Sequence, residues 1–215
     1  MRKLEYILLI IFLVLTVGCK KEIEEVKTVE HITGIPATMG EIGATGQVTG
    51  ANVSGVSNVT GSVTTNEAGV SVVTASAIVT NPTIKNFIQN LPGVTFNGDV
   101  ATVTDVKMKA TEEGIESVKG FDPGIIVKYG SVVGDKYYTK SGNERTVTAK
   151  SVDNDYSWDG MNIKIIKVEE NIQTKNGLSK VTYWANHRYG MVGLELKFVD
   201  GTTAKFPIVL SESNK

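Results

Sequence analysis

The sequence has one cysteine, two histidines and five prolines in 215 residues, and its 22 basic side chains nearly balance 23 acidic ones. A single cysteine excludes an intrachain disulfide framework and a cysteine-rich zinc site. A net charge of −1 provides no basic surface for nucleic acid, so we expect no nucleic-acid partner. An apolar content of 41% excludes a chain too polar to bury a core. The length suits one domain, or at most two.

Long apolar runs are scarce as well, and the one run of note is short. Residues 7–17 are apolar except for Thr16, and they follow the basic residues Arg2 and Lys3. As a helix this run is about 16 Å long, roughly half the thickness of the hydrocarbon core of a bilayer. The run therefore predicts the hydrophobic region of a signal peptide and not a membrane span.

The only cysteine follows this run directly, in the sequence Thr16-Val17-Gly18-Cys19. These residues resemble the lipobox of a bacterial lipoprotein, in which small or aliphatic residues lead up to a cysteine, although Thr16 departs from the usual leucine. The resemblance covers residues 1–19. It implies cleavage after Gly18, transfer of a diacylglycerol to the Cys19 thiol, and acylation of the new amine, commonly with palmitate. Two or three acyl chains anchor a protein stably to a membrane.

The resemblance also implies a location. A protein with this signal is attached to the bacterial cell envelope. Lys20 stands after the cysteine in place of aspartate, which favours the outer membrane over the inner one in a cell that has both. The alternative is an ordinary secretory signal, in which Cys19 has no role. No resemblance to a family extends beyond residue 19.

Composition divides the remaining chain into three parts behind the signal peptide, residues 1–18. Residues 19–45 combine charged side chains with glycines, and we expect the lipidated cysteine to be followed by a flexible tether. Residues 46–118 are rich in Gly, Ser, Thr and Val, and they predict a β-hairpin region with a short helix. Residues 119–215 predict an antiparallel β-meander. We expect the last two parts to pack as one globular unit.

Residues 49–65 show a period-2 alternation, with Val, Gly and Ala on one face, Ser, Thr and Asn on the other, and Val56 as the exception. Residues 66–69, Asn-Glu-Ala-Gly, have turn chemistry, so residues 49–80 predict a long hairpin. Only Glu67 is charged from Ile42 to Ile84. That is also the composition of the stems of pore-forming proteins, which gives a rival hypothesis in which this hairpin inserts into a bilayer.

One helix is predicted over residues 82–91. Asn81 is a favourable N-cap, and Pro82 suits the first helical position. Apolar side chains follow at helical spacing, namely Ile84, Phe87, Ile88 and Leu91.

From residue 121 onward the pattern predicts strands at 125–129, 136–140, 145–150, 161–171, 178–186, 191–199 and 202–210. The apolar phase shifts by one residue after Ile165, which predicts a β-bulge within one strand. The fold class that follows is all-β, as an antiparallel β-sandwich or a barrel-like meander with one short helix.

The pattern of the last two strands predicts the length of the loop between them. Each has one apolar face, and the parity of the two faces requires a loop with an odd number of residues. Three residues, 199–201, with Gly201 in a left-handed conformation, meet that requirement. Pro207 predicts an edge strand or one-sided pairing at that point. The apolar faces are Val192, Leu194, Leu196 and Phe198 on one strand, and Ala204, Phe206 and Ile208 on the other.

Polar side chains give few candidates for chemistry. His187 has no second histidine or cysteine nearby in the sequence, and we expect it in a turn. Alternating oxygens before Gly160 suggest a calcium loop, although the closing acid of an EF-hand is replaced by Ile166. The candidate calcium ligands are Asp155, Ser157 and Asp159, and the alternative is a polar loop. We expect no catalytic residue and no cofactor.

Aromatic residues are few and gathered in one part of the chain. All tyrosines and tryptophans after Tyr6 lie between Tyr129 and Tyr189. Amphipathic rings are common at recognition surfaces. The candidate ligand surface is Tyr137, Tyr138, Tyr156, Trp158, Trp184 and Tyr189, and the alternative is that these rings belong to the core or to cross-strand pairs.

Together these features predict a membrane-anchored bacterial lipoprotein with a non-enzymatic, β-rich ectodomain. It would act as a binding or structural module at the cell surface or in the periplasm, with the membrane as one partner and a protein or glycan as another. The alternatives are a membrane-inserting, pore-forming hairpin protein and a carbohydrate-binding or cryptic hydrolytic domain.

Overall fold

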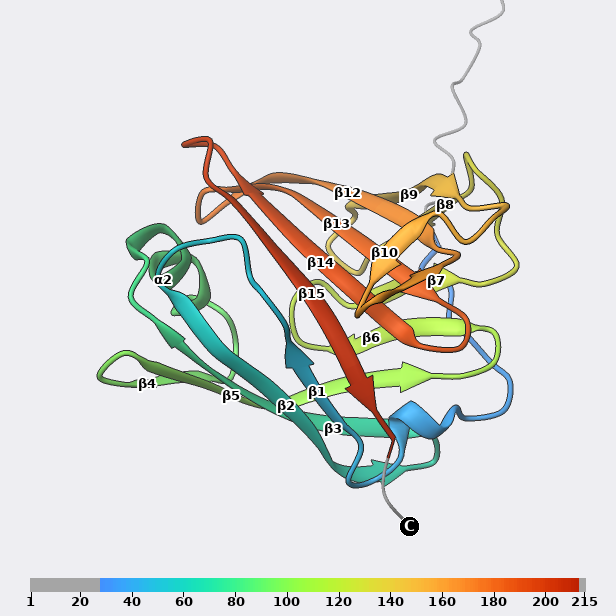
Figure 1. The fold of residues 1–215 in the computed structure, drawn as a ribbon, viewed down its shortest axis with the longest axis horizontal. Helices are drawn as coiled ribbons and strands as arrows, with labels where there is room; N and C mark the ends of the chain where they lie inside the picture. The colour runs from blue at the N-terminus through green and yellow to red at the C-terminus, as the bar shows by residue number, and fades with distance from the viewer. Residues whose placement is uncertain (1–27, 213–215) are drawn as a thin grey trace, which may run out of the picture.

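The computed structural model describes residues 28–212, apart from the side chains of residues 173–175. The predicted signal peptide with Gly18 and the predicted lipidation site Cys19 lie outside the described residues. The described protein is mostly β-strand, and its main antiparallel sheet curls into a nearly closed, barrel-like structure (Figure 1). The all-β prediction is confirmed.

The elements follow one another along the chain as strands with two short helical segments. They are η1 (Thr38–Gly40), β1 (Thr45–Val48), β2 (Val56–Glu67), β3 (Val70–Val79), α2 (Pro82–Ile88), β4 (Val94–Asn97), β5 (Val100–Ala110), β6 (Gly114–Lys119), β7 (Gly124–Lys128), β8 (Lys136–Tyr138), β9 (Glu144–Lys150), β10 (Tyr156–Trp158), β11 (Met161–Ile163), β12 (Ile166–Lys175), β13 (Leu178–Asn186), β14 (Gly190–Phe198) and β15 (Thr203–Ser211).

The main sheet has the strand order β7-β6-β5-β3-β2-β1-β15-β14-β13-β12-β9-β8, with β4 added to β5. The short strand β1 joins the two halves of the chain, because it pairs with β2 on one side and with β15 on the other. Both predicted regions therefore contribute to one sheet. In Figure 1 the strands β1–β5 form one wall, β12–β15 form the other, and α2 lies at one end between them.

The predicted hairpin is present as β2 and β3, but its first strand begins at Val56, because residues 49–55 lie in no strand. Ala68 and Gly69 form its two-residue turn with φ of 50° and 79°, values that suit the right-handed twist of the strands. Each strand also has a partner on its outer side, since β2 pairs with β1 and β3 pairs with β5. The hairpin is thus an internal part of the sheet.

The helix α2 is present but ends at Ile88, three residues before the predicted end. Asn81 caps it as expected, since its side-chain oxygen accepts a hydrogen bond from the Ile84 amide at 3.1 Å. Phe87 is buried, and its ring meets those of Phe121 and Phe198 edge-on at 5.7 and 5.6 Å between centroids. These ring contacts fix α2 across one end of the interior.

The prediction of a flexible tether up to residue 45 needs correction for its described part. Ile32 is completely buried, and its amide donates to the Glu116 carboxylate at 3.0 Å. The carbonyl of Gly40 accepts hydrogen bonds from the side chains of Ser71 and Asn66 at 2.5 and 2.7 Å. We call residues 36–44 the strap, because they cross one end of the sheet. Glycines in this stretch therefore shape turns and do not make a free linker.

The predicted single strand at 161–171 is two strands. Ile163 and Ile165 pack in a small cluster outside the main sheet, whereas Ile166 and Val168 belong to its interior. The shift of apolar phase therefore marks the passage of the chain from the β10–β11 hairpin into β12, and not a bulge between Ile165 and Ile166. A register shift does occur nearby, between Lys167 and Val168 in the pairing of β12 with β9.

The connection from β14 to β15 has the predicted three-residue loop. The Phe198 amide donates to the Thr202 carbonyl at 2.9 Å, and Gly201 has φ of 88°. The predicted apolar face is wrong for one residue. A register shift beside Trp184 turns Val192 away from the main core and into the small cluster that contains Ile163 and Ile165. Pro207 lies in an internal strand, where it pairs with Gly193 of β14 and its carbonyl accepts a hydrogen bond from the Thr49 amide on the other side at 3.0 Å, so the prediction of an edge strand or one-sided pairing is wrong.

Candidate functional site

A row of residues with little or no side chain crosses the inner face of the sheet. Gly46 of β1 lies opposite Gly61 of β2, and Gly61 lies opposite Ala75 of β3. Protein interiors are normally filled by side chains to the density of organic crystals. Three adjacent small residues on neighbouring strands of the sheet leave part of that volume empty.

The empty volume is a cavity of about 260 Å³ beside this row. Ser71, one of its polar lining residues, already donates its hydroxyl hydrogen to Gly40 of the strap. The strap closes one side with Met39 and Ala44. The larger lining side chains are almost all apolar, and they include Val59, Val63, Val73, Met108, Ile115, Met191, Ile208 and Leu210.

A cavity of this kind favours apolar contents. Its walls offer water few hydrogen-bond partners, and apolar cavities of about 150 Å³ are known to stay dry and to bind small apolar molecules. Drug-sized ligands need roughly 300 Å³ or more. The cavity therefore suits a small apolar molecule or the end of an acyl chain. Three methionines line it, and their flexible thioethers adapt to differently shaped ligands.

Four of the six predicted aromatic site residues come together outside the sheet, beneath the β10–β11 hairpin. Tyr156 stacks on Trp184 at 6.3 Å, and Trp158 lies 4.7 Å from Tyr189 between ring centroids. The indole nitrogen of Trp158 donates to the carbonyl of Ile208 at 2.8 Å. Both tryptophans are buried, so these rings mainly attach the hairpin to the sheet.

The other two predicted rings lie elsewhere. Tyr137 is buried on the inner side, where its hydroxyl meets that of Ser131. Tyr138 is half-buried, and its hydroxyl donates to Glu144 at 3.3 Å. The six rings therefore do not form one surface, and Tyr137 is a core residue.

The predicted calcium ligands occupy the hairpin and the loop before it. Asp155 accepts a hydrogen bond from the Ser151 hydroxyl at 2.6 Å, Ser157 lies in β10, and Asp159 forms the hairpin turn with φ of 44°. Within residues 28–212, no group of three His, Cys, Asp or Glu side chains is placed to hold a metal ion. His187 lies in the turn between β13 and β14, as predicted.

A buried charged cluster, which sequence reasoning missed, lies where the two ends of the sheet meet. Arg145 of β9 and Glu170 of β12 are opposite each other in register, both are fully buried, and Nε lies 2.7 Å from Oε2. The guanidinium also donates to the carbonyl oxygens of Asp122, Gly124 and Ile125 at 2.7, 3.1 and 2.9 Å. We call this cluster the seam, because it links β9 to the edge strand β7.

The seam also shifts the pKa values of two acids. Burial raises the pKa of Glu170 despite the attraction of Arg145, and its hydrogen bond with Asp122 raises it further. Burial also acts to raise the pKa of Asp122, but hydrogen bonds from Glu170 and Ser141 outweigh it, so that pKa is lowered. The hydrogen bond between these two acids therefore shifts their pKa values in opposite directions, while the Glu170 carboxyl group stays in contact with the guanidinium.

A hollow of about 490 Å³ lies between α2 and the seam, and Asp122 and Asn143 line it. The Asp122 carboxylate accepts from the Ser141 hydroxyl at 2.5 Å and from the Asn143 amide at 2.7 Å. Both carboxylate oxygens of Asp122 already accept hydrogen bonds from the protein. We therefore assign this acid to the contacts that close the sheet, and not to ligand binding. The sequence carried one signal for the seam: Arg145 shares the inward phase of Val147, and Glu170 shares that of Val168.

Comparison of the chain with protein-family models, with curated proteins and with solved structures finds no match. Within residues 28–212, no helix is long and apolar enough to cross a membrane. The site must therefore be interpreted from its own geometry.

Proposed function

We propose that the protein is a lipid-anchored component of the bacterial cell envelope, and that its β-domain binds a small apolar molecule or the acyl end of an amphiphile. The anchor is supported by the hydrophobic run and by Gly18-Cys19. The outer membrane is the proposed location. The role of the domain is binding and not catalysis.

The ligand proposal depends on one observation, the apolar cavity beside Gly46, Gly61 and Ala75. Burial of apolar surface contributes about 25 cal/mol per Å², so an acyl chain gains free energy on entering it without needing polar contacts. The proposal replaces a protein or glycan as the bound partner.

The alternatives have less support. A membrane-inserting hairpin would have to leave strands β1 and β5, which pair with its two outer sides. Its outward face carries polar side chains such as Thr60, Ser62 and Ser76, whereas a lipid-facing surface is apolar. A glycan site at the aromatic cluster would have to use rings that already pack on each other.

The anchor is tested by growing cells with an alkyne fatty acid. The wild-type protein should become labelled and should fractionate with membranes. Cys19→Ser should lose the label and remain uncleaved or soluble. Labelling of the Cys19→Ser protein would contradict the anchor without touching the ligand proposal.

The ligand is tested by titrating the protein with a fluorescent fatty acid such as parinaric acid. Saturable binding with one site per chain is expected. Gly61→Leu should obstruct the cavity, since a Cβ at position 61 meets Ala75 at an ordinary 3.5 Å and further atoms extend into the free space. The matched control is Ser62→Leu, which places the same side chain one residue along β2.

A further inference from the structure

The N-terminal part of the described chain is fixed at one end of the sheet. Glu30 lies 2.5 Å from the ammonium of Lys128, the last residue of β7, and His31 lies 2.5 Å from Glu116 of β6. Ile32 then enters the interior. Any attachment through residues before 28 therefore leaves from this end.

A tight turn at the same end exposes two valines. The loop 129–135 begins directly after Lys128, and it presents Val132 and Val133 with 60% and 59% of their surface exposed. The turn is held by its own hydrogen bonds, because the Val132 amide donates to the Asp135 carboxylate at 2.9 Å and the Asp135 amide donates back at 3.2 Å.

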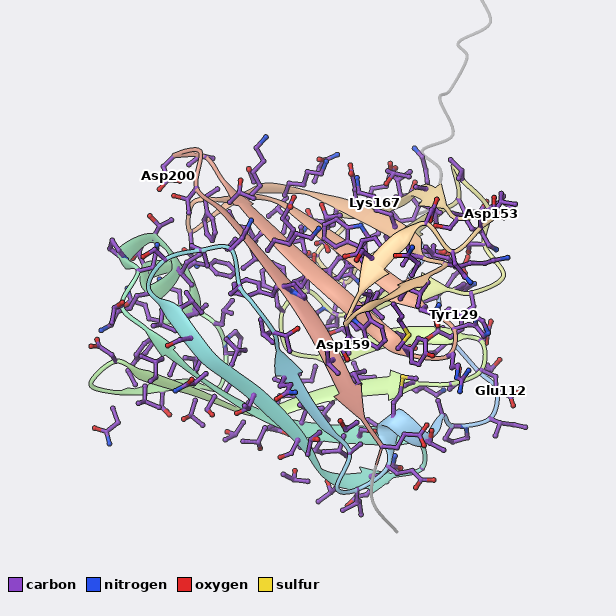
Figure 2. The ribbon with its side chains drawn as sticks, viewed as in Figure 1. Glu112, Tyr129, Asp153, Asp159, Lys167 and Asp200 are labelled. Carbon is purple, nitrogen blue, oxygen red and sulfur yellow. The ribbon has the colours of Figure 1, made fainter. Side chains whose placement is uncertain are left out.

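A second loop brings a third valine to this end. Lys150 donates to the carbonyl oxygens of Tyr129 and Ser131 at 3.1 and 2.7 Å, and so joins the end of β9 to the valine turn. The loop 151–155 follows directly, and its Val152 is 80% exposed. Figure 2 shows Tyr129 and Asp153 on the same side of the molecule, and Asp200 on the opposite side.

Charges at this end do not suggest an electrostatic partner. Lys128 is paired with Glu30, and Lys150 is held by carbonyl groups. Asp135 is used in the turn, and Asp153 adds a negative charge. Exposed apolar side chains rimmed by polar groups mark interaction surfaces. Three such valines on loops at this end suit a lipid surface, and no anionic headgroup is needed.

We infer that the valine loops, 129–135 and 151–155, contact the membrane surface and hold the domain in a fixed orientation on it. This inference depends on the proposed lipid anchor. Thr28 stands nine positions after Cys19, and a fully extended chain over nine positions reaches only about 32 Å. The anchor thus keeps this end of the sheet close to the bilayer.

The test uses the full, lipidated protein in phosphatidylcholine vesicles. Val132→Cys, Val152→Cys and the control Val199→Cys are each labelled with a polarity-sensitive fluorophore, since the acylated Cys19 sulfur cannot react. Val199 is 64% exposed in the β14–β15 loop at the opposite end, beside Asp200. Emission should shift to shorter wavelength at positions 132 and 152 on vesicle binding, and should stay unchanged at 199.

Two further outcomes separate the two proposals. If the labelled proteins float with the vesicles but positions 132, 152 and 199 give the same emission, the anchor stands and the contact by the valine loops is wrong. If the wild-type protein isolated from cells carries no acyl chain and does not float, the anchor is wrong, and the inference drawn from it is overturned as well. Val133→Asp should abolish the shift at position 152 without preventing flotation.

Discussion

Arg145 and Glu170 face each other across β9 and β12 with no exposed surface, at 2.7 Å between Nε and Oε2. The pair does more than join two adjacent strands, because the same guanidinium covers the carbonyl groups at the edge of β7. Buried backbone carbonyls without partners are costly. One side chain therefore satisfies a strand edge and completes the nearly closed sheet.

Arg145→Met should lower the free energy of unfolding by about 3–5 kcal/mol, as expected when one partner of a buried pair is removed. Arg145→Lys should recover little, because an ammonium group cannot make the forked contacts of the guanidinium. Denaturant unfolding measures both.

The double variant Arg145→Met/Glu170→Leu separates the seam from a simple ion pair. Replacing both partners of a simple buried pair is often neutral or stabilising. Here the double variant should stay destabilised, because the carbonyl groups of Gly124 and Ile125 lose their donor. A double variant as stable as the wild-type protein would show that the seam is an ordinary pair.

The β14–β15 loop gives a second prediction. Gly201→Val should destabilise the protein by about 1–2 kcal/mol, and backbone strain alone should cause it, since φ is 88° and a Cβ there meets no atom within 4 Å.

Leu196→Ala should destabilise the protein by about 2–5 kcal/mol, because Leu196 is buried in the core. Glu195→Ala should cost under about 0.5 kcal/mol. If Glu195→Ala destabilised the protein more than Leu196→Ala in denaturant unfolding, the assignment of Leu196 to the core and of Glu195 to the opposite face would be contradicted.

High pH should weaken the fold through tyrosine. Burial raises the pKa of Tyr129 to about 12, from about 10 in the unfolded chain. The folded state then binds more protons than the unfolded state, so the contribution is complete below pH 10 and is lost as the pH rises to about 12, by roughly 2–3 kcal/mol. Unfolding of Tyr129→Phe should show a smaller loss over that range than unfolding of the wild-type protein. Equal losses in the two proteins would contradict the assignment.

Local patterns in the sequence predicted much of this fold, and long-range packing explains what they missed. Alternation and turn chemistry located the β2–β3 hairpin, and the parity of two apolar faces together with Gly201 predicted the three-residue loop. The phase shift after Ile165 was visible, but only tertiary structure shows that the chain changes sheets there. Ile32 was hidden among charged residues because its burial depends on Glu116, 84 residues away.

The candidate site was less accessible to sequence reasoning. Gly46, Gly61 and Ala75 lie next to one another only after three strands pair in this register. Each glycine had an ordinary interpretation as part of a Gly-rich segment. The aromatic residues were conspicuous in the sequence, but a tryptophan packs a hairpin as readily as it binds a ligand.

Titration of the protein with parinaric acid, together with its Gly61→Leu and Ser62→Leu variants, tests the central claim most directly. The wild-type protein and Ser62→Leu should bind one ligand per chain with equal affinity. Gly61→Leu should weaken binding by about tenfold or more, equivalent to about 1.4 kcal/mol, while remaining at least as stable in denaturant because the variant fills a void. Absence of saturable binding to the wild-type protein, or equal binding by all three proteins, would contradict an apolar ligand site in this cavity.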